Sequence, residues 1–169
     1  MLPINELLQH SLLYGAILSL LLSVLIIASL YLRPMVWIKD ATPEVQAVAP
    51  PLTEGDRRAK AVVAVLFFAI LIGTMVVGLI TLRNLAGGSL TFIEAFLATF
   101  IILQTFNLVD LLILDWLIVE YWRPSFITFP GAEGLDLFAG YTHHFVGFLK
   151  GTAMGLAAGL VVGVIVVVF

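Results

Sequence analysis

The chain has 169 residues, of which 62% are hydrophobic and 11% are charged, and its formal net charge is −3 at pH 7. A soluble domain carries about 45–50% apolar and about 25% charged residues, so this composition excludes a soluble enzyme and a disordered tail. The acidic balance excludes binding to nucleic acid. The sequence contains no cysteine, which rules out disulfides, cysteine-ligated metal centres and a cysteine nucleophile. We therefore expect an integral membrane protein.

Four stretches are long and apolar enough to span a bilayer, which requires about 20 mostly apolar residues. We expect an all-α polytopic membrane protein in which residues 1–169 form a single domain, with the four helices in one bundle. The N-terminal region lacks the basic segment of a signal peptide, so the first stretch is expected to remain as a span. The predicted spans are residues 11–32, 61–82, 91–122 and 143–169.

Local signals mark the ends of these spans. Pro34 and Pro124 disfavour helix at the residues before them, so they should end the first and third spans. Thr91 and Glu94 have the spacing of a capping box at the start of the third span. At about 1.5 Å per residue this span is about 48 Å long, which exceeds the hydrocarbon core of about 30 Å. The third helix must therefore tilt, kink or project from the membrane.

Basic residues predict the orientation, because cytoplasmic loops carry an excess of lysine and arginine. Loops 33–60 and 123–142 hold most of the eight basic residues, whereas the opposite side holds only Arg83. We expect both loops to be cytoplasmic, both termini to lie outside, and the membrane to be a bacterial inner (plasma) membrane. Aromatic residues suited to the interface lie at the same end, namely Tyr31, Trp37, Tyr121, Trp122 and Tyr141.

The two loops differ in composition. The middle of the first, ATPEVQAVAPPLTEGD, is rich in proline, alanine and acids, which predicts an extended tether and not a folded unit. The second is more apolar, and one interpretation is a short re-entrant or interfacial element with a turn at Pro130–Gly131. The side chains expected on the membrane surface are Phe126, Phe129, Leu137 and Phe138.

The fourth span carries glycine at every fourth position, which forms a ridge that another helix can approach closely in lipid. Three interpretations remain open: packing inside the bundle against the first span, an external face for a second copy or another subunit, and a permeation groove. The first span has a lesser ridge at Ser11, Gly15, Ser19 and Ser23. The main ridge consists of Gly147, Gly151, Gly155, Gly159 and Gly163.

Polar residues gather inside the third span. At about 100° per residue, Gln104, Asn107, Asp110 and Asp115 fall within an arc of about 140°, whereas Glu120 lies elsewhere near the end. A carboxylate at the bilayer centre costs at least about 2.5–3.5 kcal/mol, so this arc should face protein or water. Asp110, the deepest acid, is interpreted either as a proton relay or as part of a structural hydrogen-bond cluster with Asn107.

Lys150 is the only lysine within a span. It and Asp115 lie at matched depth, about 10 Å from the same interface, which predicts an ion pair between them. The alternative is that Lys150 extends its amine to the interface. The candidate intramembrane polar cluster is Gln104, Asn107, Asp110, Asp115 and Lys150.

His143 and His144 open the fourth span and are candidate interfacial ligands. Adjacent residues on a helix point about 100° apart, so they cannot clamp one ion together. His10 lies at the opposite end, which disfavours a haem held by two histidines. We predict no catalytic residues, no metal site and no cofactor, although ligation of a chlorin or metal by a single histidine, Asn107 or Asp110 stays open. No nucleophile elbow, P-loop or HExxH motif appears, which indicates a protein that is not an enzyme.

Three segments together, NLVDLLILDWLI, FPGAEG and HHFVGFLKG, resemble a group of small four-span bacterial membrane proteins of uncharacterised function. The likeness covers roughly the C-terminal third and implies no activity. It does imply that Asp110, Asp115, His144 and Lys150 belong to the group's pattern. Length and span number are also similar to those of small multidrug exporters, but this sequence departs from them because its first span has no acid and its loops are longer.

The leading functional prediction is a non-enzymatic accessory, assembly or interaction subunit of a membrane complex, acting through the glycine ridge. Its expected partners are membrane lipids and either another membrane subunit or a second copy. One alternative is a proton-linked or small-solute transporter that uses Asp110, Asp115 and Lys150. Another is a lipid or pigment site around Trp116, Trp122 and His144. A cavity reaching Asp110 would favour transport, whereas a packed Asp110 with the ridge covered by a partner would favour the accessory role.

Overall fold

A computed structural model describes residues 2–138 and 140–168, and these are all-α, with no β-strand. Four helical rods are long and apolar enough to cross a membrane, which confirms the number predicted from the sequence. α4 and η2 form one of these rods, Phe92–Trp122, in which η2 is a π-helix. In chain order the elements are α1 (Ile4–Leu32), the 3-10 helix η1 (Pro34–Asp40), α2 (Pro43–Val48), α3 (Glu54–Leu85), α4 (Phe92–Val109), η2 (Asp110–Trp122) and α5 (Tyr141–Val168).

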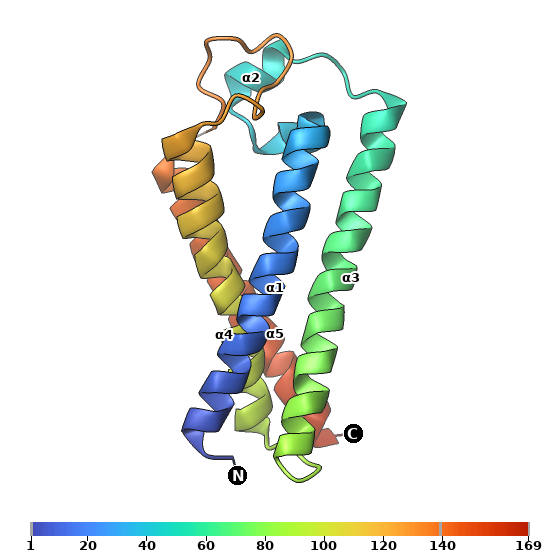
Figure 1. Cartoon of the computed structure of the whole chain (residues 1–169), viewed down its shortest axis with the longest axis vertical. Helices are drawn as coiled ribbons and strands as arrows, with labels where there is room; N and C mark the ends of the chain where they lie inside the picture. Colours follow the sequence, from blue (N-terminus) through green and yellow to red (C-terminus); the bar gives the residue numbers. More distant parts are fainter. Residues whose placement is uncertain (1, 139, 169) are drawn as a thin grey trace.

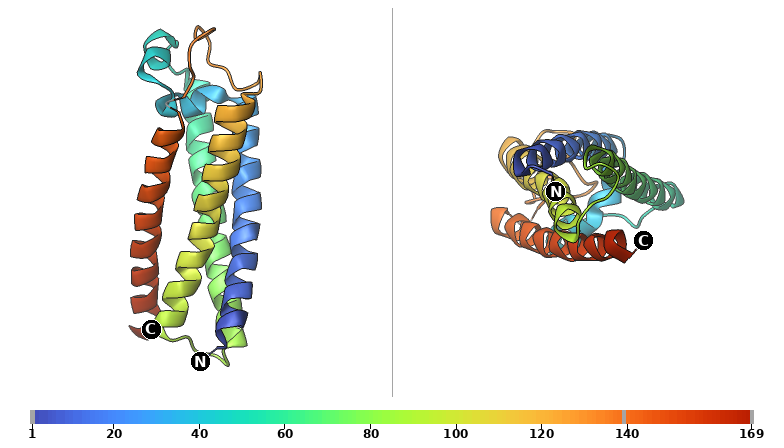
Figure 2. Two further views of the ribbon diagram at one scale, coloured as in Figure 1. Left: turned by 90° about the vertical axis from the view of Figure 1, so that its left-hand side faces the viewer. Right: turned by 90° about the horizontal axis from the view of Figure 1, so that it is seen from below.

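The four rods run side by side, with the chain ends and the short connection between α3 and α4 at one end (Figure 1). This end is called the terminal end, and the end that carries both long loops is called the loop end. α4 is the central helix, since it packs against α1, α3 and α5. Among the described residues α5 contacts only α4 and η2, so it lies to one side of the α1–α3–α4 group (Figure 2). The predicted contact between the first and last spans is therefore not formed.

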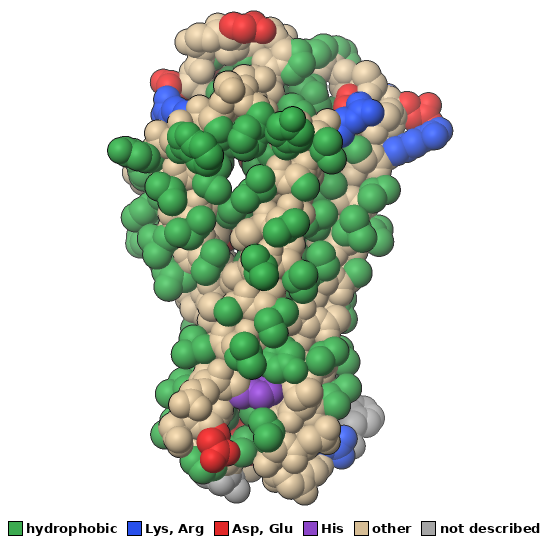
Figure 3. Space-filling model, viewed as in Figure 1, with side chains coloured by type: hydrophobic (Ala, Val, Ile, Leu, Met, Phe, Trp, Pro, Cys, Tyr) green, Lys and Arg blue, Asp and Glu red, His purple; other side chains and the backbone are tan. Residues whose placement is uncertain are grey.

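The surface between the two ends is largely apolar. Hydrophobic side chains are spread over the length of the rods, and charged side chains gather at the terminal and loop ends (Figure 3). Large side chains such as Leu20, Phe68 and Val161 are each more than half exposed. Such a surface suits helices that cross a membrane, because a soluble protein rarely leaves so continuous an apolar belt in water.

The helix ends follow local chemistry. α1 stops at Leu32, two residues before Pro34, as expected. Thr91 and Glu94 form the predicted capping box at the start of α4. A second capping box, formed by Thr53 and Asp56, begins α3 at Glu54, seven residues before the predicted start of the span. The helix thus extends beyond its apolar segment, because the capping hydrogen bonds satisfy its first backbone N–H groups.

The first loop is not an extended tether, so that prediction is wrong. η1 and α2 fold over the loop end, and Thr42 caps α2 by accepting a hydrogen bond from the backbone N–H of Val45. Val45 is fully buried against Phe129 of the second loop. The two loops bury apolar residues against each other, which the composition of either loop alone does not reveal. The buried cluster consists of Met35, Ile38, Ala41, Val45, Phe129 and Ala132.

The second loop contributes to this cluster and does not simply lie on the membrane surface. Phe129 is only 2% exposed, which contradicts its predicted surface location. The turn at Pro130–Gly131 is confirmed, and Gly131 has a φ of +82°, a conformation that suits glycine. The loops thereby form a lid of two interlocked segments over the loop end of the helices.

Candidate functional site

The glycine ridge of α5 packs against α4. A Cβ atom placed on Gly159 would lie 2.9 Å from Cδ2 of Phe96, and one on Gly163 would lie 2.8 Å from Cε2 of Phe92. Gly155 faces Phe100 in the same way. Phenylalanines of α4, spaced by four residues, therefore pack against the glycine ridge along most of its length. The partner helix is α4, not the predicted α1, whose own Gly15 packs against Thr105 of α4.

Asn107 joins α4 to α5 beside this ridge. Its side-chain Nδ2 donates hydrogen bonds to the backbone oxygen of Phe148 at 3.0 Å and to Oγ1 of Thr152 at 3.2 Å. A weaker contact at 3.5 Å reaches Oε1 of Gln104. No hydrogen bond joins Asn107 to Asp110 within residues 2–138 and 140–168. The predicted Asn107–Asp110 cluster is therefore not formed, and Asn107 serves to hold the two helices together.

A cavity of about 430 Å³ lies in the loop-side half of the molecule, between α1, α4, η2 and α5. The space-filling view shows an opening in this half of the surface (Figure 3). Toward the terminal end the helices close around a packed cluster that includes Leu18, Leu22 and Ile102, all with no exposed surface. The polar residues of the cavity wall are Asp40, Asn107, Asp110, Asp115, His143, His144 and Lys150.

Asp110 stands at the first turn of η2, partly buried in the wall of this cavity. Its carboxyl group makes no hydrogen bond or ion pair with any described residue. An unpaired carboxyl within a span is costly unless it faces polar space. The cavity supplies that space, so Asp110 is positioned to exchange a proton or to contact a small solute there.

Lys150 also lines the cavity, and it too makes no ion pair with a described residue. The predicted Asp115–Lys150 ion pair is not formed, because Oδ2 of Asp115 lies 3.0 Å from Nδ1 of His144. Asp115 of η2 thus pairs with His144, near the start of α5. Lys150 stays available to whatever occupies the cavity.

His144 lies between two carboxylates. Its Nε2 is 3.2 Å from Oε1 of Glu120, on the side opposite to the Nδ1 contact with Asp115. Both ring nitrogens can donate hydrogen bonds only when the imidazole carries two protons. The geometry therefore fits an imidazolium held by one carboxylate at each nitrogen.

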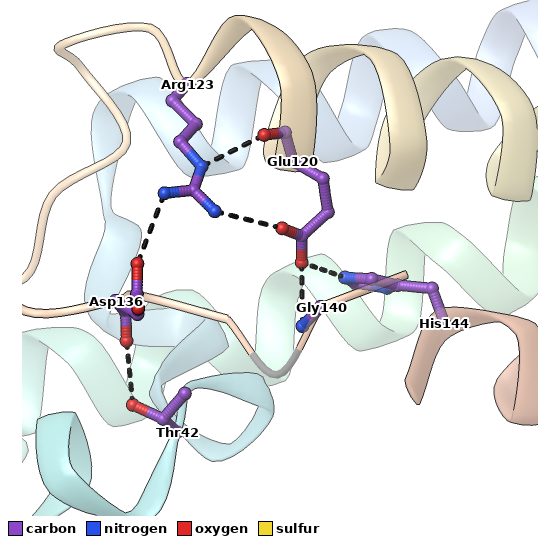
Figure 4. A network of polar contacts seen from close by, with 6 residues as sticks. All are labelled: Thr42, Glu120, Arg123, Asp136, Gly140 and His144. Carbon is purple, nitrogen blue, oxygen red and sulfur yellow. Dashed lines mark hydrogen bonds and ion pairs between the residues drawn. The ribbon is translucent and has the colours of Figure 1, made fainter. Parts of the chain in front are cut away.

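Glu120 is the centre of a polar network at the loop end (Figure 4). Its side chain is 3% exposed and accepts hydrogen bonds from the backbone N–H of Gly140 at 2.9 Å and from Arg123 at 3.2 Å. The Arg123 guanidinium also reaches Asp136 at 3.2 Å. These hydrogen bonds, the one to Glu120 foremost, raise the pKa of Arg123 above its ordinary value, so its charge is secure. Thr42 adds the first loop to the network by donating to the Asp136 backbone oxygen.

Glu120 is a site residue that the sequence analysis placed away from the polar cluster, and the π-helix explains why. Asp110, Asp115 and Glu120 are spaced by five. In an α-helix five residues turn through about 140° beyond a full turn, which would scatter the three acids around the rod. A π-helix pairs residues five apart, which brings residues at this spacing nearer to one side of the rod. Asp115 and Glu120 both reach His144, and Asp110 and Asp115 share the wall of the larger cavity. The five-residue spacing of these acids was the feature of the sequence that could have placed Glu120 in the site.

A second cavity of about 190 Å³ lies under the second loop. It is lined by Glu120 and Arg123, and it shares Val119 and Phe138 with the larger cavity. The Glu120–His144 contact therefore lies where the two hollows meet.

Other predicted site residues are not gathered here. Trp116 packs its ring against Tyr141 with centroids 5.7 Å apart, and Trp122 is 65% exposed. Neither lines the larger cavity, so this cavity does not bring Trp116 and Trp122 together with His144, the three residues predicted around a lipid or pigment site. Gln104 is likewise outside the wall. Within the described parts of the chain, no three histidine or acidic side chains converge in a metal-binding arrangement.

Comparison with protein-family models, with curated proteins and with solved structures finds no match.

Proposed function

We propose that this protein is a small proton-linked membrane transporter, in which Asp110 receives protons from the loop end and passes them on through the cavity. The observation that carries this proposal is that the Asp110 carboxyl, within a span, faces a cavity of about 430 Å³ and has no partner in the described chain. Acidic residues within spans commonly mark ion and proton pathways.

The uneven packing of the bundle supports transport in particular. The loop-side half holds the cavity, whereas the cluster around Leu18, Leu22 and Ile102 fills the middle of the bundle and closes the cavity on its terminal side. A transporter needs a site that is accessible from one side at a time, and this arrangement provides access from the loop end. With the orientation expected from the basic residues, that end is cytoplasmic.

The glycine ridge, which motivated the accessory role, is occupied by α4 along Gly155, Gly159 and Gly163. It offers no free face to an external helix at these positions. The accessory role thus loses its main support, and the cavity at Asp110 is the feature that the sequence analysis associated with transport.

The test is proton flux in liposomes that contain the purified protein and a trapped pH-sensitive dye. An imposed pH gradient with potassium and valinomycin should collapse faster than in protein-free vesicles. Asp110→Asn, which keeps the shape but cannot carry a proton, should reduce this flux by at least roughly tenfold, since a positioned proton-transfer group contributes about a hundredfold or more. Glu44→Gln, at an exposed position on α2, is the matched control and should behave as wild type. Equal flux in wild-type and protein-free vesicles, or full flux in Asp110→Asn, would contradict the proposal.

A further inference from the structure

We propose that the His144 imidazole passes protons from Glu120 to Asp115, and so links the cavity under the second loop to the cavity that holds Asp110. This inference rests on the proposed function, because it assigns the route by which protons reach Asp110. It concerns residues whose role is separate from that of Asp110 itself.

The two cavities supply the first argument. The smaller has Glu120 in its wall, and the larger has Asp115 and His144 in its wall. Val119 and Phe138 border both, and they form an apolar partition that water crosses poorly. The chain from Glu120 through His144 to Asp115 runs past this partition without a gap longer than a hydrogen bond.

The contacts of His144 supply the second argument. Its two nitrogens lie 3.0 and 3.2 Å from the two carboxylates, within the range in which a proton moves directly between heavy atoms. Asp115 and Glu120 both come from η2, while His144 comes from α5. A proton that enters by one carboxylate can therefore leave by the other without any movement of the helices.

Glu120 is held in an orientation that suits this transfer. Arg123 binds its Oε2, and the backbone N–H of Gly140 binds its Oε1, the same oxygen that faces His144 (Figure 4). The guanidinium and the N–H position the carboxyl so that one oxygen stays directed at the ring. Arg123 itself keeps its charge and serves as a positioning residue.

Every proton in the transfer from Glu120 to Asp115 can be accounted for. A protonated Glu120 gives its proton to Nε2 of a neutral His144, which becomes the imidazolium that the two contacts fit. The Nδ1 proton then moves to the Asp115 carboxylate. One proton has entered at Glu120 and one has left at Asp115. The ring regains its first tautomer when water in the larger cavity, which His144 lines, takes the Nε2 proton and returns one to Nδ1, so no proton passes back to Glu120.

Several other charged groups face this chain and set its electrostatics. From η1, Asp40 stands at the rim of the larger cavity, and from η2, Asp110 stands in its wall. The wall desolvates the Asp40 carboxyl and raises its pKa, although much of that residue is exposed, and Lys60 partly offsets the effect. From α5, His143 and Lys150 line the same cavity. The acids stabilise the imidazolium, and Lys150 opposes it.

The experiment uses the same liposomes with two variants of His144. His144→Ala should reduce proton flux by at least roughly tenfold. Millimolar imidazole should restore part of the flux measured above that of protein-free vesicles with the same imidazole, because the free ring fits the space that the side chain leaves. His144→Gln retains a polar side chain at this position but cannot relay a proton, and it should remain as slow as His144→Ala. Wild-type flux in His144→Gln would show a merely structural role and overturn the proposal.

The controls separate the relay from the function on which it rests. Imidazole should not restore the double variant His144→Ala/Glu120→Gln, which lacks the donor. In His143→Ala, which removes a neighbouring ring without a hydrogen bond in the described chain, imidazole should not change the flux measured above that of protein-free vesicles in the same buffer. If Asp110→Asn abolishes flux but His144→Ala does not, the relay is wrong and the proposed function stands. If wild-type flux does not depend on Asp110, the proposed function itself fails.

Discussion

The side-chain amide of Asn107 occupies the space that a side chain at residue 151 would need. A Cβ atom on Gly151 would lie 2.9 Å from Cγ of Asn107 and closer still to Oδ1. The same amide binds Phe148 and Thr152 on α5. Close approach and hydrogen bonding thus occur at one point of the α4–α5 contact, and each depends on the other.

We expect these two residues to be energetically coupled. Gly151→Ala should destabilise the protein by about 1–3 kcal/mol through overpacking, and Asn107→Ala by about 0.6–1.7 kcal/mol through lost hydrogen bonds in the membrane. The double variant should lose less than the sum by at least about 0.5 kcal/mol, because removing the amide makes room for the new methyl group. Unfolding in mixed micelles on addition of denaturing detergent measures all four proteins. Additive losses would contradict this view of the contact.

The ridge further along α5 should be equally intolerant of added volume. Gly159→Ala places its methyl group 2.9 Å from Cδ2 of Phe96 and 3.1 Å from the backbone oxygen of that residue, so we expect a loss of about 1–3 kcal/mol. Gly73→Ala on α3 is the matched control, since nothing lies within 4 Å of its added Cβ. The control should be neutral or slightly stabilising, because alanine favours helix over glycine. Thermal unfolding followed by circular dichroism in mild detergent distinguishes the two; similar melting temperatures would count against the α4–α5 packing.

The two contacts of Arg123 should differ in strength. Its partner Glu120 is 3% exposed, whereas its partner Asp136 is 82% exposed. Arg123→Gln leaves a buried carboxylate without its cation and should cost about 1–3 kcal/mol, less than a fully buried pair because the guanidinium is itself half exposed. Asp136→Asn removes only an exposed pair and should cost at most about 1 kcal/mol. Thermal unfolding at low and high salt tests the order, and a larger loss for Asp136→Asn would reverse our assignment.

The lid formed by the two loops should depend on Phe129. Phe129→Ala removes a side chain that is 2% exposed from the centre of the loop cluster and should cost about 3–5 kcal/mol locally. The first loop should then become sensitive to protease, although no residue within it has changed. Leu135→Ala, at an exposed position of the second loop, is the control. Limited proteolysis with mapping of the cleavage sites checks this, and protection of residues 33–49 in Phe129→Ala would show that the loops fold independently.

The orientation can be tested directly, because the chain has no cysteine of its own. Single cysteines at Glu44 and at Ser89, both exposed, report on the loop end and the terminal end. With the loops in the cytoplasm, a membrane-impermeant maleimide added to intact cells should label Ser89→Cys and spare Glu44→Cys until the membrane is permeabilised. The opposite labelling would invert the topology expected from the basic residues.

Local chemistry made much of the architecture predictable from the sequence. Apolar runs identified four spans, Pro34 and Pro124 marked two helix ends, and Thr91 with Glu94 marked a helix start. Each of these signals acts through neighbours a few residues away along the chain. The glycine ridge likewise indicated close helix packing, but not which helix, because glycine presents no side chain that selects a partner.

Contacts between distant segments were beyond the reach of such signals. The composition of the first loop predicts a tether. In the structure its Val45 is buried by Phe129, which lies more than eighty residues later in the chain. Asp115 and Lys150 share a depth, yet depth does not specify direction around the helix axis. The structure directs Asp115 toward His144 instead.

The composition, with so few charges, predicted helices long and apolar enough to cross a membrane, and it made each of the few polar residues within them a candidate for a specific role. Only the tertiary structure decided how those residues meet. The third rod changes from α to π geometry at Asp110, which aligns acids spaced by five, and α5 then presents His144 between two of them. The physical reason is that helix type sets the angle between side chains, and the change of type was not signalled by the apolar sequence around it.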